Sequence, residues 1–382
     1  MRIIVCFNFT EDPGNPGYTD VGMAFILGLR QLGHEVIPIE DVDPKRCLDA
    51  HRNPVAFDQW DGRDHFERLT RTSGLWPRCC LIYNRGEATW GMTWREVVEA
   101  AKTCDLALNI GGRLKSPPLL ESLRCMAYVD INPAKTQVYH AEYGLDRGFD
   151  HHQFFFTVGL NIGTPRSEIP ACGRTWYGTL QPVVLPMWPP ENGPGAAPWT
   201  TISTWSGRET FKFKGRFSGE KLDQWLRFIE LPKKTGARLE IALKIGPKHA
   251  EDIRRFEENG WTLTDPRQIR DLASYRRYIA SSRGEFSVAN YRYVQFNTGW
   301  FSDRSARYLA SGRPVLVQAT GIEEHLPVGT GLLTFGTMEE AVAGIEAVDR
   351  DYPAHQRAAR ALAEEYFDSA KVLSRMLALM GF

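Results

Sequence analysis

The sequence predicts an α/β protein made of two Rossmann-like domains in tandem with a cleft between them. Three observations support this fold class. In the first half, apolar runs of strand length alternate with segments of helical periodicity, as in parallel sheets covered by helices. A proline-rich stretch, 181–198, then interrupts the pattern, and the alternation restarts after it. The length of 382 residues suits two domains.

The expected elements of the first half follow from local pattern. Residues 3–9 form an apolar, β-branched run, and 21–32 carry apolar residues at helical spacing before Gly33, which suits a left-handed helix end. Further strands are expected at 36–39, 80–83, 105–110, 126–130 and 154–159, and further helices at 66–72 and 94–102. The prolines of 181–198 propagate neither a helix nor a central strand, so this stretch is interpreted as a linker.

The second half repeats the pattern. Pro232 ends a helix expected at 220–231, and Thr337 with Glu340 forms a capping box that begins a helix through 348. Strands are expected at 199–204, 239–244, 285–289, 314–318 and 332–335, and helices at 249–258 and 268–280. The tail 354–380 has few helix breakers, so it predicts a helix that packs back on the first domain. The predicted domains are 1–185 and 199–353, with 354–382 as the returning helix.

Composition excludes several classes of protein. Lys and Arg total 46, as do Asp and Glu, so the basic excess of a nucleic-acid-binding protein is absent. No apolar run reaches the length of a membrane span, and the N-terminal segment lacks a signal-peptide pattern. The seven cysteines show no C-x-x-C spacing and read as reduced thiols. We expect a cytoplasmic monomer or homodimer that binds no nucleic acid and has no integral membrane segment.

Three familiar nucleotide and hydrolase motifs are missing from the sequence. No G-x-G-x-x-G follows the first strand, and no G-x-x-x-x-G-K-[ST] or G-x-S-x-G is present. A Gly/Pro-rich loop, 8–20, follows the first strand instead. This loop is interpreted either as a solvated connection or as a clamp on the acceptor or sugar, and the sequence favours neither.

The second half carries a candidate anion site. A helix is expected to begin at Ser302 or Asp303, and helix N-termini offer free N–H groups and positive potential to a diphosphate. Ser305 adds a hydroxyl, and the planar guanidinium of Arg304 neutralises phosphate. The turn Thr320-Gly321 follows the next strand and is expected to approach the same ligand.

The stretch from Tyr308 through Pro327 (Y-L-A-S-G-R-P-V-L-V-Q-A-T-G-I-E-E-H-L-P), followed by G-T-G-L-L-T-F, resembles GT-B-fold glycosyltransferases, and 299–302 echoes their G-W-N-S segment. The segment G-L-R-Q-L-G-H-E-V, 28–36, resembles their first helix and second strand. The chain is therefore similar to bacterial glycosyltransferase family 1-like proteins. This resemblance implies a GT-B fold, with an acceptor-binding domain at 1–185 and a donor-binding domain at 199–353.

The resemblance implies a hexosyltransferase that moves a sugar from a nucleotide-diphosphate sugar, such as a UDP-sugar, to a small-molecule or glycan acceptor. It implies no metal and no cofactor, because a helix dipole and basic side chains neutralise the diphosphate. The candidate donor-binding residues are Lys244, Gly299, Trp300, Ser302, Asp303, Arg304, Ser305, Thr320, Gly321 and Glu324, with Arg208 and Lys212 as further phosphate-binding candidates. A nucleotide-sugar 2-epimerase and a catalytically silent sugar-nucleotide binder remain as alternatives.

The catalytic group is less defined, because two positions depart from the family pattern. Arg307 stands where retaining members often carry a glutamate, and Tyr18 stands where inverting small-molecule members carry a histidine. Inversion needs a general base on the acceptor hydroxyl. Asp20 in the first loop and Asp130 at the end of the strand 126–130 are the two candidates. The alternative role of Asp20 is helix capping, and the alternative role of Asp130 is turn formation.

Overall fold

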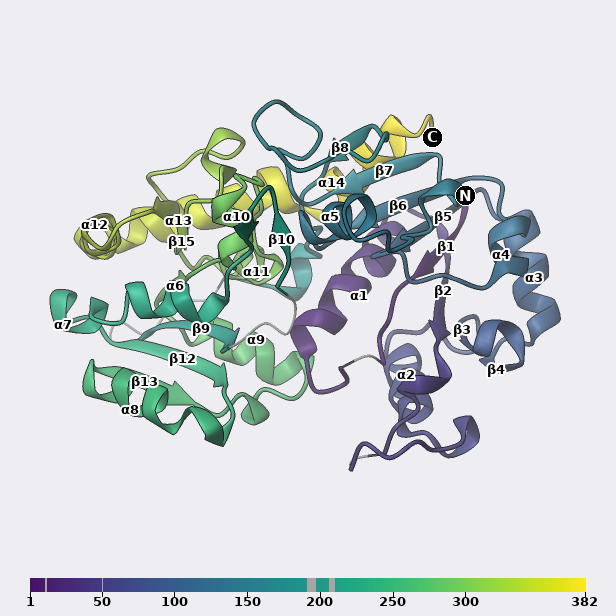
Figure 1. Ribbon diagram of the computed structural model, residues 1–382, viewed down its shortest axis with the longest axis horizontal. Coiled ribbons are helices and arrows are strands. Elements are labelled where there is room, and N and C mark those ends of the chain that lie inside the picture. The colour runs from purple at the N-terminus through teal and green to yellow at the C-terminus, as the bar shows by residue number, and fades with distance from the viewer. Residues whose placement is uncertain (11, 50, 191–196, 206–209) are drawn as a thin grey trace.

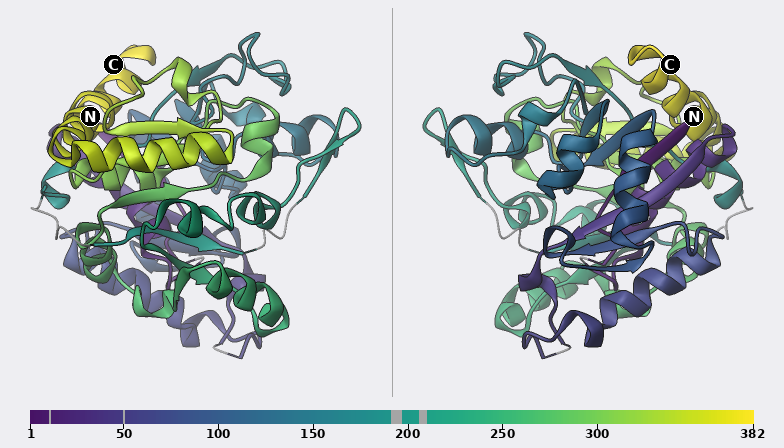
Figure 2. Two further views of the ribbon diagram at one scale, coloured as in Figure 1. Left: turned by 90° about the vertical axis from the view of Figure 1, so that its left-hand side faces the viewer. Right: turned by 90° about the vertical axis from the view of Figure 1, so that its right-hand side faces the viewer.

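The computed structural model describes residues 1–10, 12–49, 51–190, 197–205 and 210–382 (Figure 1). The strands form two large sheets, one from each half of the sequence, and one short hairpin. Helices cover both sheets (Figures 1 and 2). We call residues 1–198 the N-terminal half and residues 199–382 the C-terminal half.

The first sheet contains eight strands in the order β4-β3-β2-β1-β5-β6-β7-β8, and only β4 runs antiparallel to its neighbour. The strand order reverses between β1 and β5, where sheets of this kind open a crevice at the carboxyl ends of the strands. The elements are β1 (Arg2–Cys6), α1 (Pro16–Gln31), β2 (Glu35–Val42), α2 (Asp61–Thr72), β3 (Cys80–Tyr83), β4 (Ala88–Gly91), α3 (Trp94–Thr103), β5 (Leu106–Ile110), α4 (Pro117–Ser122), β6 (Met126–Asp130), α5 (Lys135–Ala141), β7 (Phe154–Thr157) and β8 (Trp176–Gly178).

Helix α1 begins earlier than the apolar pattern predicts. Asn15 caps the helix, since its Oδ1 accepts from the Tyr18 N–H at 3.1 Å, and Pro16 suits the first helical turn. The helix ends as expected, with Gly33 at a φ of 84°. The short outer strands β4 and β8 were not predicted, because neither has a long apolar run.

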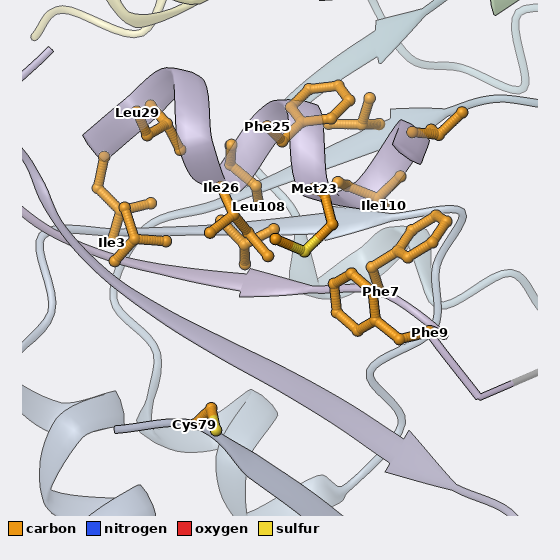
Figure 3. Packing of buried hydrophobic residues seen from close by; sticks show 14 of the residues in the cluster. Ile3, Phe7, Phe9, Met23, Phe25, Ile26, Leu29, Cys79, Leu108 and Ile110 are labelled. Carbon is orange, nitrogen blue, oxygen red and sulfur yellow. The ribbon is translucent and has the colours of Figure 1, made fainter. Parts of the chain in front are cut away.

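One of the buried apolar clusters of the N-terminal half lies between α1 and the sheet (Figure 3), and another lies between the sheet and α3. Phe25, Ile26 and Leu29 on α1 are fully buried against Ile3 and neighbouring strand residues such as Leu108. Burying one such side chain contributes about 1.5–3 kcal/mol. This packing fixes the position of α1, and so of the loop that precedes it.

The second sheet contains six parallel strands in the order β13-β12-β9-β14-β15-β16, and its order reverses between β9 and β14. The hairpin β10–β11 lies outside this sheet. The elements are β9 (Trp199–Thr204), β10 (Lys212–Phe213), β11 (Arg216–Phe217), α6 (Lys221–Arg227), α7 (Leu231–Thr235), β12 (Leu239–Lys244), α8 (Ala250–Glu258), β13 (Trp261–Thr264), α9 (Leu272–Ala280), β14 (Gly284–Ser287), α10 (Tyr291–Gln295), α11 (Asp303–Ala310), β15 (Val315–Gln318), β16 (Leu332–Phe335) and α12 (Met338–Arg350).

One predicted helix of the C-terminal half is divided in the structure. The segment expected as one helix over 220–231 contains α6, which ends at Arg227, and a separate short helix, α7. Pro232 lies in the first turn of α7, which begins at Leu231, because proline is tolerated in a first turn, where its missing N–H is not needed. The predicted capping box of Thr337 and Glu340 is present at the start of α12.

The C-terminal helices return to the N-terminal half (Figures 1 and 2). Helix α13 (Tyr352–Leu362) continues through one π-helical turn, Ala363–Phe367, and α14 (Ser369–Leu379) follows. Gly28 of α1 lets α14 approach closely, since a Cβ there would lie 2.6 Å from Leu373 and 2.8 Å from Ser369. The contact between α1 and α14 therefore packs the C-terminal segment against the N-terminal half. No described helix has the length and apolar character needed to cross a membrane.

Candidate active site between the two sheets

A cavity of about 380 Å³ lies at the carboxyl ends of the strands, between the two halves. Its walls come from the β1–α1 loop, the residues after β6, the crossover after β8, the ends of β9 and β12, the segment before and within α9, and the starts of α6 and α11. The lining residues are Asp12, Gly14, Asn15, Pro16, Gly17, Tyr18, Val21, Ile131, Asn132, Gln181, Ile202, Ser203, Thr204, Lys221, Lys244, Pro266, Ile269, Tyr275, Tyr293, Trp300, Asp303 and Arg304.

The Gly/Pro-rich loop after β1 forms one wall of this cavity. Asp12 lies 3.9 Å from Lys244 at the end of β12, so the loop reaches the opposite half. Gly17 fits closely against α9, because a Cβ at this position would lie 3.4 Å from the Tyr275 hydroxyl. The loop therefore lines the cavity, while Pro13, Gly14 and Asn15 are also exposed to solvent.

The N-terminus of α11 forms the opposite wall. Asp303 and Arg304 both line the cavity, as the sequence predicted for the start of this helix. Arg304 is held in place from behind: its Nε lies 2.5 Å from Glu285 Oε1, and its Nη2 donates to Ser287 Oγ at 2.7 Å. Glu285 is fully buried on β14. The guanidinium is therefore positioned at the cavity by a rigid strand.

Lys221, at the start of α6, is a charged cavity residue that the sequence did not indicate, and Asp12 was not singled out either. Burial, together with the positive charge of Arg304, lowers the pKa of Lys221 to about 7, although Glu285 and Asp303 oppose this shift. A lysine in the first helical turn is unfavourable with respect to the helix dipole. This unfavourable position is the one local feature of the sequence that could have indicated a functional role for Lys221.

Asp303 lies beside these cations. Burial raises the pKa of Asp303, although Arg307 and Arg304 lower it. Trp300 also lines the cavity, and its ring stacks on that of Tyr293 with centroids 4.3 Å apart and an interplanar angle of 21°. The pair presents an aromatic surface to the cavity. Lys244 lines the cavity too, with a side chain that is 70% exposed.

Three of the predicted donor residues lie elsewhere, at a junction between the two halves. A Cβ on Gly299 would lie 3.0 Å from the Asn161 backbone nitrogen, and one on Gly321 would lie 2.6 Å from Asn161 Nδ2. Glu324 forms an ion pair with Arg166 at 2.5 Å. The close approach that the sequence indicated at these glycines is therefore an approach to other protein atoms. Gly299 lies against the N-terminal half, whereas a Cβ on Gly321 would lie nearest, at 2.2 Å, to Asn297 Oδ1 of the C-terminal half.

Ser302, Ser305 and Thr320 line a separate small cavity behind the N-terminus of α11, with a volume of about 10 Å³. The Thr320 hydroxyl donates to the Trp300 carbonyl at 2.6 Å. Lys212 lies on the β10–β11 hairpin, where its Nζ is 5.7 Å from the centre of the Phe217 ring, and it does not line the main cavity. Arg208 lies outside the described residues.

Neither of the two predicted general bases lines the cavity. Asp20 accepts from Arg307 Nε at 2.7 Å in a buried pair. Asp130 is fully buried and accepts from the Thr136 hydroxyl at 2.7 Å, Gln137 Nε2 at 2.8 Å and the Thr157 hydroxyl at 2.9 Å. These contacts place both carboxylates in structural networks next to the cavity.

Comparison with known proteins identifies the fold. No profile of a known protein family and no curated protein sequence matches the chain. An alpha-glucosyltransferase in complex with UDP aligns over 100% of both chains, with a TM-score of 0.60 and 11% identity. Anabaena Alr3699/HepE in complex with UDP-glucose aligns over 100% of this chain and 99% of that chain, with a TM-score of 0.61 and 12% identity. The chain has the GT-B fold of these structures, as expected.

Proposed function

We propose that this chain is a metal-independent glycosyltransferase of the hexosyltransferase type, which moves a sugar from a UDP-sugar to an acceptor hydroxyl. The cavity between the two sheets carries this proposal, because Lys221, Arg304 and the N-terminus of α11 converge on it. Helix N-termini and fixed cations are suited to a diphosphate. The similar structures are described in complex with UDP or UDP-glucose, which supports the choice of nucleotide.

The donor binds along the wall formed by the C-terminal half. Backbone N–H groups at Asp303 and Arg304 face the diphosphate at the helix N-terminus, and Lys221 neutralises part of its charge. The stacked pair of Tyr293 and Trp300 offers an aromatic face to the base or the sugar. Preorganised positive charge stabilises the leaving group as negative charge develops on it.

The transfer step forms one bond and breaks one bond. The acceptor oxygen attacks C1 of the donor sugar, the bond from C1 to the β-phosphate oxygen breaks, and its electron pair leaves with UDP. In an inverting reaction the hydroxyl proton passes to a carboxylate. We assign that base to Asp12, the carboxylate that the β1–α1 loop brings to the cavity, in preference to Asp20 or Asp130.

A thermal-shift panel of UDP, dTDP, GDP and ADP tests the donor site. A ligand at a hundred times its Kd stabilises the folded state by about 2.7 kcal/mol, so UDP is expected to raise the melting temperature most. Arg304→Ala is expected to weaken UDP binding by about 1–3 kcal/mol, the contribution of a charge-assisted contact. Unchanged UDP affinity in a folded Arg304→Ala variant contradicts the proposed site.

Transfer assays separate the alternatives. A 2-epimerase converts a nucleotide sugar without any acceptor, and a silent binder takes up UDP without transferring or hydrolysing the sugar. The proposed transferase releases UDP together with a glycosylated acceptor.

A further inference from the structure

Two cations of the proposed diphosphate site, Lys221 and Arg304, come from different helices and line the same cavity. Like charges that share a partly buried site repel each other, so this pair is unfavourable unless a negative charge lies nearby. In the complex the diphosphate supplies that charge. Before the ligand binds, a group of the protein has to supply it.

Glu285 is the carboxylate placed to offset the two cations. It lies on β14, where the strand order of the second sheet reverses, and it is fully buried. Its Oε1 is 2.5 Å from Arg304 Nε and accepts from the Thr201 hydroxyl at 3.1 Å. Its Oε2 is buried and has no hydrogen-bond partner among the described residues. The carboxylate is not part of the cavity lining, so it acts from behind the wall.

Four charged groups act on Lys221 from the elements around it. Arg304 and Asp303 belong to α11, Glu285 to β14 and Arg292 to α10. The two arginines disfavour the charged form of the lysine, whereas the two carboxylates favour it. Asp303 lines the cavity itself, so a bound diphosphate repels it, and burial raises its pKa. Glu285 is therefore the carboxylate that supports both cations without facing the ligand.

We propose that Glu285 is a positioning residue for the donor diphosphate, which holds Arg304 at the cavity and keeps the neighbouring Lys221 positively charged before the ligand binds. This inference rests on the proposed function and adds to it a residue that acts through two others. Cations that are placed and charged in advance need no rearrangement when the diphosphate arrives.

Glu285→Gln tests the proposal, because it keeps the shape of the side chain and removes its charge. The pKa of Lys221 is about 7 in wild type, and loss of this charge should lower it by about one. Between pH 6 and pH 7 the charged fraction of Lys221 then falls about fivefold in the variant and about twofold in wild type.

Isothermal titration measures the Kd for UDP of each protein at both pH values. The Kd of Glu285→Gln divided by that of wild type should be about threefold larger at pH 7 than at pH 6. Any ionisation of UDP itself cancels in this ratio, since both proteins are titrated with the same ligand. A role confined to holding Arg304 in place would give a ratio that does not change with pH.

Ser287→Ala is the matched control. Ser287 also lies on β14 and accepts from Arg304 Nη2 at 2.7 Å, but it carries no charge. Its loss should weaken UDP binding by the same factor at both pH values. Glu285→Asp, which keeps the charge on a shorter side chain, should likewise give a constant ratio. In a Lys221→Met background, Glu285→Gln should no longer produce a ratio that changes with pH.

The outcomes distinguish this inference from the proposed function. Wild-type protein that does not bind UDP overturns the donor site and the inference with it. A constant ratio for Glu285→Gln, with UDP binding by wild type intact, overturns the inference alone. A pH-dependent ratio that persists in the Lys221→Met background, or that Ser287→Ala reproduces, also overturns it. Glu285→Met, which is neutral and of similar size, takes the place of Glu285→Gln if circular dichroism shows that Glu285→Gln does not fold.

Discussion

Arg307 Nε lies 2.7 Å from Asp20 Oδ2, and this ion pair joins α11 of the C-terminal half to α1 of the N-terminal half. Both side chains are at most 5% exposed. Arg307 also donates from Nη1 to the Asp303 carbonyl at 3.0 Å. The position where the resemblance places a glutamate therefore holds an arginine whose carboxylate partner comes from the opposite half. The pair fixes the two cavity walls relative to each other.

Asp20→Asn is expected to destabilise the protein by about 3–5 kcal/mol, because it leaves the buried Arg307 charge without its counter-charge. Denaturant unfolding measures this change. Turnover of the folded protein should remain near wild type, since Asp20 does not line the cavity. Asp150→Asn, which removes a 91% exposed carboxylate paired with Arg174, is the matched control and should cost about 1 kcal/mol or less. A hundredfold loss of kcat in folded Asp20→Asn restores Asp20 as the base.

UDP affinity is expected to fall as the pH rises above 7. Burial lowers the pKa of Lys221 to about 7, so the free protein loses this positive charge above that pH and must take up a proton to bind the anion. Below pH 7 Lys221 already carries its charge, and the affinity should level off. Titration calorimetry should show Kd rising about fivefold between pH 7 and pH 8.

Lys221→Met should bind UDP weakly and lose this pH dependence. Lys234→Met, in a weak exposed pair with Glu230, is the control and should retain it. A wild-type Kd that stays constant from pH 7 to pH 8 argues that Lys221 does not contact the diphosphate.

Asp12→Asn should reduce kcat on the order of a hundredfold or more and leave the Kd for UDP within a few-fold, because it removes the base and keeps the side-chain shape. This result is expected for an inverting enzyme, and product stereochemistry is measured by NMR in the same assay. Full turnover in Asp12→Asn with an inverted product excludes Asp12 as the base.

Asp130→Asn is the companion variant. It should cost about 1–3 kcal/mol of stability, because an amide cannot accept from all of the donors that surround Asp130, and the folded fraction should keep its turnover. Measuring both stability and kcat distinguishes a structural role, expected for Asp130, from a catalytic role, expected for Asp12. Loss of kcat without loss of stability in Asp130→Asn reverses the assignment.

Transfer should proceed in the presence of EDTA. The Asp41-Val-Asp43 segment resembles a metal-binding D-x-D, but Asp41 accepts from the Lys115 N–H at 2.8 Å and Asp43 accepts from the Lys45 N–H at 2.9 Å. Both carboxylates are engaged by backbone outside the cavity lining. Activity that EDTA abolishes and that Mg²⁺ or Mn²⁺ restores contradicts metal independence.

Local sequence pattern predicted most of the strands well. The expected ranges of β3, β6, β9, β12 and β16 match the structure at both ends. It also predicted the cavity positions of Trp300, Asp303, Arg304 and Lys244, because a helix that follows a strand in this fold begins at the crevice. Gly299 and Gly321 were expected to approach a ligand, and in the structure they lie against other protein atoms. A glycine indicates that another group comes close to the backbone, and the sequence does not say which group this is.

The sequence by itself determined the fold class, because alternating periodicity, caps and turn residues act over short stretches of chain. Only the tertiary structure decided which charged groups meet. Asp20 and Arg307 are far apart in sequence, and so are Lys221, Glu285 and Arg304. The Asp20–Arg307 pair depends on how the two halves pack together, and the Arg304–Glu285 pair depends on packing within the C-terminal half. That packing places Asp12 and Lys221 at the cavity, and it places Asp20 and Asp130 in structural networks outside its lining.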